Sequence, residues 1–158
     1  MIDLTSTPII ILVILGSVGV ALPVISIALK ERPSMMSYGI ATLIAMFASI
    51  GYVLYQIALE HVAPAAIFSQ DVLVDDAFGS LFAIAMLIVA IFTTIGSFSY
   101  MKNKANPSVY FSLILLSTIG MVLVAYSTDL VMLFVAWELM SIPTYILVGF
   151  LKKDPISN

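Results

Sequence analysis

The sequence predicts an all-α, polytopic membrane protein with five transmembrane helices. Of its 158 residues, 62% are hydrophobic and 9% are charged, whereas an ordinary soluble domain carries about 45–50% apolar and about 25% charged residues. The few charges separate five long uncharged or nearly uncharged stretches. Inside hydrocarbon only helices and closed barrels satisfy their own backbone. Because these runs are continuous and lack the alternation of barrel strands, they indicate helices.

Each stretch is long enough to cross a bilayer, which takes roughly 20 residues. We expect helices over about 8–29, 36–59, 77–100, 107–127 and 130–151, which together form a single transmembrane domain over residues 1–158. The first stretch follows Asp3 and has no basic residue before it. It is therefore not a cleavable signal peptide, which needs a basic flank and a shorter apolar run.

The other four stretches are set by the residues that bound them. The second lies between a tight turn at 30–34 and Glu60, and the third follows Asp76. The fourth fills the gap between Lys104 and Asp129 and begins around Pro107. The fifth starts after Asp129, whose side chain can accept hydrogen bonds from the unpaired N–H groups of the first turn.

One connection is long, and we expect it to form an external loop over 60–76. Within it, residues 67–74 contain two short runs of strand-forming residues around a polar turn. This pattern predicts a small β-hairpin.

The basic residues predict the orientation. All six fall in alternate connections, so they share one side of the membrane: Lys30, Arg32, Lys102, Lys104, Lys152 and Lys153. Basic residues concentrate on the cytoplasmic side. We therefore expect the N-terminus outside and the C-terminus in the cytoplasm, with the chain in the cytoplasmic membrane of the cell.

Composition also excludes several kinds of site. The chain has no cysteine, which excludes thiolate-ligated zinc and cysteine-ligated iron–sulfur clusters. Its single histidine, His61, excludes a haem held between two histidines of this chain. It has no basic footprint for nucleic acid and no glycine-rich nucleotide loop. We expect no cofactor or metal bound by this chain, and the lipid bilayer as its surroundings.

Glu138 is the main candidate for function. It stands alone in the otherwise uncharged stretch 130–151, where counting from both ends places it within about 4 Å of the midplane. A charge there costs at least about 2.5–3.5 kcal/mol and is functional by default. A carboxyl group that takes up or releases a proton when a neighbouring cation moves can serve as a proton relay. The alternative is a permanently protonated Glu138 that only joins two helices.

Three residues near Glu138 are candidate supports for it. Pro143 cannot donate a backbone hydrogen bond and clashes with the carbonyl of Leu139, so it breaks the helix beside the carboxylate. Ser141 or water can satisfy the freed carbonyl. Trp137 is a possible further support, although a packing role against lipid or another helix also explains it.

The stretch 107–158, and especially Gly120–Phe150, resembles subunit N of NADH-quinone oxidoreductase, respiratory complex I, and the equivalent subunit of archaeal dehydrogenases that oxidise a reduced deazaflavin cofactor. The resemblance rests on the Asp129-Leu opening, Glu138 in mid-helix, the following Ser-x-Pro and a basic exit at 152–153. Weaker similarity covers the rest, including Asp76-Ala-Phe-Gly-Ser. These proteins belong to the antiporter-like membrane subunits, and the resemblance implies that Glu138 matches their proton-channel glutamate.

The resemblance also implies partners. Family members continue through further helices, and a lysine on the seventh works against the glutamate. Every lysine of this chain lies in a connection or in the tail. We therefore expect an N-terminal portion, from a split or truncated gene, whose missing helices and midmembrane lysine come from another polypeptide.

The function expected from this resemblance is that of a proton-translocating membrane subunit in a respiratory electron-transport complex, not an enzyme alone. Flavin, iron–sulfur clusters and quinone are expected in partner subunits. Two alternatives stay open: a non-catalytic assembly or scaffold subunit, and a fragment of a multisubunit sodium/proton antiporter.

Overall fold

The computed structural model describes residues 6–28, 34–59, 72–102 and 106–150. Within them lie five helices that are long and apolar enough to cross a membrane. They are α1 (Thr7–Ala28), α2 (Met35–Ala58), α3 (Ala77–Tyr100), α4 (Pro107–Tyr126) and α5 (Leu130–Gly149). The all-helical class and the five spans predicted from the sequence are confirmed. The largest departure in helix length is α5, which ends at Gly149, whereas the sequence suggested 151.

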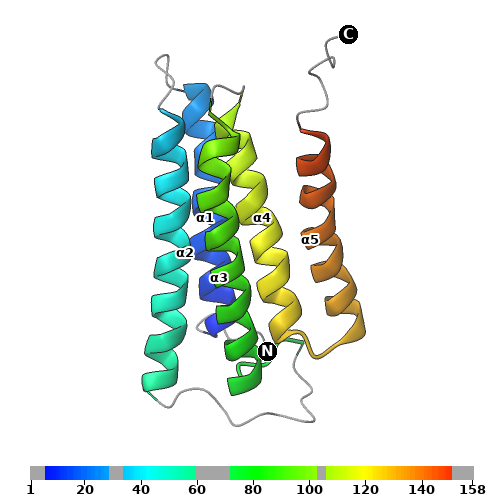
Figure 1. The fold of residues 1–158 in the computed structure, drawn as a ribbon. Helices are drawn as coiled ribbons and strands as arrows, with labels where there is room; N and C mark the ends of the chain where they lie inside the picture. The colour runs from blue at the N-terminus through cyan, green and yellow to red at the C-terminus, as the bar shows by residue number, and fades with distance from the viewer. Residues whose placement is uncertain (1–5, 29–33, 60–71, 103–105, 151–158) are drawn as a thin grey trace.

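The first four helices form a bundle, and α5 stands at its edge (Figure 1). α4 packs against α1, α2 and α3, whereas α5 packs against α4 alone among the described helices. The buried core follows from this arrangement. α4 contributes Phe111, Leu115 and Tyr126 to it, all nearly inaccessible to solvent. α5 buries only Ala136 and Pro143 among its twenty residues.

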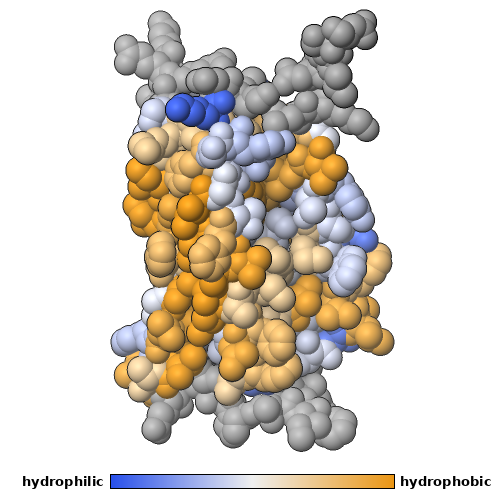
Figure 2. All heavy atoms as spheres, viewed as in Figure 1, coloured by the Kyte–Doolittle hydropathy of each residue, from blue (hydrophilic) through white to orange (hydrophobic). Residues whose placement is uncertain are grey.

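Apolar side chains cover much of the outside of the bundle. Figure 2 shows hydrophobic residues along the length of one face, and residues as large as Phe92 and Val148 are 70% and 81% exposed. Such a surface suits lipid or further helices and would be poorly soluble in water. The apolar outer surface of the bundle is therefore consistent with the predicted membrane protein.

The connection before α3 ties one end of the bundle together. Asp76 caps α3 by accepting from Gly79 N at 2.7 Å, and Asp75 Oδ2 accepts from Thr7 N at the start of α1 at 2.8 Å. Asp129 caps α5 by accepting from Val131 N and Met132 N. These three carboxylates, Asp75, Asp76 and Asp129, define what we call the acidic end of the bundle.

The predicted β-hairpin at 67–74 lies mostly outside the described residues. The part that is described, from Val72 to Val74, pairs with the α4–α5 connection. Val74 N donates to Tyr126 O at 3.0 Å, and Thr128 N donates to Val72 O at 3.3 Å. An isolated antiparallel bridge joins Leu73 to Ser127. A segment near α3 in sequence thus binds the start of α5.

Of the six basic residues used to predict the orientation, only Lys102 is described. It lies two residues after the last residue of α3, at the opposite end of that helix from Asp76. The other five, Lys30, Arg32, Lys104, Lys152 and Lys153, lie outside the described residues, as do residues 60–71 of the expected external loop. Apart from Glu138, the described charged residues therefore lie at the two ends of the bundle, and Glu138 lies between these ends.

Candidate functional site

Glu138 lies near the middle of α5 and is the only charged residue within any of the five helices. It stands eight residues after Leu130 and eleven before Gly149, or about 12 Å and about 16 Å along the helix axis. The helix forms there because Asp129 caps its start and an uncharged run of helix-compatible residues follows.

The Glu138 side chain starts from the face of α5 that α4 does not cover. Ala136 and Pro143 are the buried residues of α5, and at about 100° per residue they lie within about 20° of each other. Glu138 is about 200° from Ala136 on the same projection. Its neighbours on that face, Phe134 and Tyr145, are 63% and 71% exposed.

Glu138 itself is partly buried. Among the described residues, no hydrogen bond or ion pair to its carboxylate is recorded. The nearest polar contact is to its backbone: Ser141 Oγ donates to the Glu138 carbonyl at 3.4 Å. Ser141 thus bonds the carbonyl of Glu138 and not that of Leu139, which Pro143 leaves without its helical donor.

Pro143 and Trp137 are about 140° and about 100° around α5 from Glu138. Pro143 is buried on the face that packs against α4, and Trp137 is 56% exposed. The structure therefore brings Ser141 together with Glu138 only through the backbone. Neither Pro143 nor Trp137, among the described residues, makes a hydrogen bond with the Glu138 carboxylate.

The α4–α5 contact contains polar groups that the sequence did not single out as candidates. Ser117 Oγ of α4 donates to the Met140 carbonyl at 3.2 Å, and Thr144 Oγ1 donates to the same carbonyl at 2.8 Å. The two hydroxyls are 3.3 Å apart. Ser117 and Gly120 are three residues apart and so share one side of α4, but the sequence does not indicate that α5 is the helix they meet.

Gly120 brings the two backbones together beside these hydroxyls. A Cβ at this position would collide with the backbone nitrogen of Met140 and lie 2.9 Å from the Ala136 carbonyl. Small residues at a transmembrane interface allow such close approach. The backbone of Met140 consequently contacts α4 at two points. Its amide side packs closely against Gly120, and its carbonyl accepts a hydrogen bond from Ser117.

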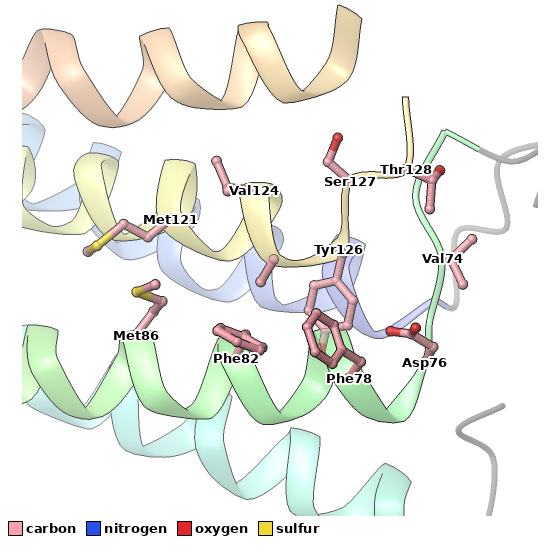
Figure 3. A pocket seen from close by; sticks show the side chains of 11 residues that line it. Val74, Asp76, Phe78, Phe82, Met86, Met121, Val124, Tyr126, Ser127 and Thr128 are labelled. Carbon is pink, nitrogen blue, oxygen red and sulfur yellow. The ribbon is translucent and has the colours of Figure 1, made fainter. Parts of the chain in front are cut away.

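A separate groove of about 340 Å³ opens near the acidic end (Figure 3). Phe78 and Phe82 of α3 and Met121 and Val124 of α4 form its apolar walls, and Asp76 lies at its rim. Glu138, Ser141, Pro143 and Trp137 are not among its lining residues. The groove and the candidate carboxylate are therefore different places.

Five apolar helices with a single internal carboxylate define a polytopic membrane protein with a charged residue inside one span. Comparison with known proteins names the relatives. The chain is 31% identical over 147 residues to NADH-quinone oxidoreductase subunit N 1 of Solibacter usitatus, which covers 92% of this chain and 29% of that protein. It is 32% identical over 160 residues to the subunit N of Desulfitobacterium hafniense, covering 99% of this chain and 30% of that protein.

A third relative extends the resemblance to archaea. F(420)H(2) dehydrogenase subunit N of Methanosarcina mazei is 38% identical over 88 residues, or 56% of this chain and 18% of that protein. No family model matches the chain. The chain is homologous to subunit N of NADH-quinone oxidoreductase and of F(420)H(2) dehydrogenase, as the sequence predicted, and it spans less than a third of the length of the relatives it matches.

Proposed function

We propose that this chain is the N-terminal portion of a membrane subunit in a proton-translocating NADH-quinone or related dehydrogenase complex, and that Glu138 relays protons within it. The observation that carries the proposal is the placement of Glu138. It is the one charged residue inside the helices, on the face of α5 that α4 leaves open, in a homologue of subunit N.

The free-energy cost of a charge inside the membrane favours a charged or polar partner for the Glu138 carboxylate. A charged side chain near the middle of a bilayer is costly and normally faces a protein interior or a wet path, paired with another group. Among the described residues Lys102 is the only basic one, and it lies beyond the end of α3. The partner therefore comes from outside the described part of the chain. We propose a lysine of a further helix.

The open face of α5 suits such a helix. Val131, Phe134 and Tyr145 are 71%, 63% and 71% exposed and share the side of α5 that carries Glu138. A helix packed there would cover these side chains and bring its own polar group to the carboxylate. The matched relatives are more than three times as long as the aligned region, so they have residues to supply this helix. In this chain's complex it comes from another polypeptide or from a continuation of this one.

The same proposal includes the orientation and the partners. The acidic end faces outward, and the end that carries Lys102 faces the cytoplasm of the cell, because basic residues gather on that side. Flavin, iron–sulfur clusters and quinone belong to other subunits of the complex. This chain contributes ion translocation and no redox chemistry of its own.

Substitution of Glu138 tests the proposal in membrane vesicles that contain the whole complex. Glu138→Gln keeps the size and hydrogen-bonding capacity of the side chain but removes the exchangeable charge. We expect proton pumping to be lost, with the complex assembled in normal amount. Asp129→Asn is the matched control, because asparagine also caps a helix and the position is at the end of α5. It should pump normally.

The results separate the alternatives. Normal pumping by Glu138→Gln would exclude the relay and favour a scaffold role. Sodium/proton exchange by the purified assembly without any redox subunit would favour an antiporter. Loss of pumping in Asp129→Asn as well would show that removal of any carboxylate from α5 disturbs the helix.

A further inference from the structure

We propose that Ser117 of α4 is a positioning residue for Glu138, acting through the backbone of Met140. This inference rests on the proposed function, since it concerns what holds the proposed relay in place. Ser117 touches neither the carboxylate nor the proton. It bonds the Met140 carbonyl at 3.2 Å, two residues along α5 from Glu138.

The position of this bond matters because α5 is interrupted there. Pro143 has no N–H, so the carbonyl of Leu139 lacks its helical donor. The next carbonyl, that of Met140, receives two hydroxyl donors, from Ser117 and from Thr144. A bond from α4 thus strengthens α5 one residue beyond the point where proline weakens it.

The same contact fixes the rotation of α5. α4 is the only described helix that packs against α5, so contacts along this seam decide which side of α5 turns away from the bundle. Ser117 and Gly120 both meet Met140, one at its carbonyl and one at its amide side. With Met140 held against α4, Glu138 is directed to the open face, where the proposed partner lysine would lie. Without the Ser117 bond, the segment beside Pro143 is freer to rotate.

α4 supplies a matched control for this bond. Ser112 Oγ also donates to a carbonyl of another helix, that of Gly19 in α1, at 2.5 Å. Ser112→Ala removes the hydrogen bond from α4 to Gly19, and Ser117→Ala removes the hydrogen bonds from α4 to the Met140 carbonyl and to the Thr144 hydroxyl. Only Ser117→Ala removes a bond to the helix that carries Glu138. Ser117→Cys is the second variant, because it keeps nearly the same size and a weak donor.

Two measurements on the assembled complex test the role. The first is the proton-pumping rate per complex, together with the rate of electron transfer. The second is the infrared carboxyl band of Glu138, identified as the band that disappears in Glu138→Gln. We expect Ser117→Ala to lower pumping about three- to tenfold, in line with the strength of interhelical hydrogen bonds in membranes, and to shift the band. Ser117→Cys should lose less, and Ser112→Ala should change neither reading.

Other results would overturn the proposal. An unshifted Glu138 band in Ser117→Ala would show that Ser117 does not set the carboxylate. Equal losses in Ser117→Ala and Ser112→Ala would indicate general packing. Failure of both Ser117 variants to assemble would assign the residue a structural role. If Glu138→Gln pumps normally, the relay itself fails, and the band shift still decides whether Ser117 positions Glu138.

Discussion

The backbone N–H of Thr7 donates a 2.8 Å hydrogen bond to Asp75 Oδ2, which joins the start of α1 to the segment that leads into α3. The two residues are 68 positions apart in the chain. Thr7 is fully buried, so its N–H has no access to solvent as a replacement. Asp75 therefore caps a helix to which it does not belong.

Asp75→Ala should destabilise the protein by about 1–2 kcal/mol, because it leaves the N–H of a helix start unpaired and removes a negative charge from the positive end of α1. Asp75→Asn keeps an acceptor and should lose less. Thermal unfolding in mild detergent measures the difference. The control is Gln56→Ala, which removes a polar side chain bonded only within α2 and should change the midpoint little. Equal stability of Asp75→Ala and wild type would exclude the cap.

Gly120→Ala should weaken the α4–α5 contact. The new Cβ would meet the backbone of Met140 and the carbonyl of Ala136, and backbone atoms cannot move aside as a flexible side chain can. Overpacking of this kind costs typically 1–3 kcal/mol. Because the chain has no natural cysteine, cysteines introduced in α4 and α5 can report the contact through the rate of disulfide cross-linking. We expect a slower rate in Gly120→Ala.

Gly96→Ala provides the comparison for that experiment, since apart from its chain neighbours and the adjacent backbone of its own helix no atom lies within 4 Å of the position of its Cβ. It should cross-link at the wild-type rate. An unchanged rate in Gly120→Ala would mean that α5 tolerates displacement from α4 at Met140. The close approach of Gly120 to Met140 would then no longer be evidence that the rotation of α5 is fixed.

Hydrogen exchange should show that the pairing at the acidic end is stable. The amides of Val74 and Thr128 donate to the carbonyls of Tyr126 and Val72. We expect both amides to exchange slowly compared with an unbonded loop amide. Asp75→Ala should speed the exchange of Val74, since it releases the adjacent residue from α1. Fast exchange of both amides in the wild-type protein would contradict a pairing that persists in solution.

The sequence by itself determined the class of protein, the approximate helix bounds and the candidate carboxylate. Long uncharged runs in a chain with few charges can only be helices in a bilayer, because every backbone group must be satisfied within the segment. Caps such as Asp76 and Asp129 are local, so the residues beside a helix predict where it begins. Glu138 was identifiable for the same reason: the cost of burying its charge does not depend on the details of packing.

Only the tertiary structure decided how α5 is held. Ser117, Gly120 and Thr144 are small residues that occur throughout transmembrane helices, and nothing in the sequence indicates which neighbour each one meets. The pairing of Val72–Val74 with the α4–α5 connection, where a hairpin within 67–74 was expected, depends on contacts between distant segments. Likewise, Asp75 caps α1 and not α3, the helix that it precedes in the sequence. Helix formation depends on near neighbours in the chain, whereas packing and rotation depend on which helices come together.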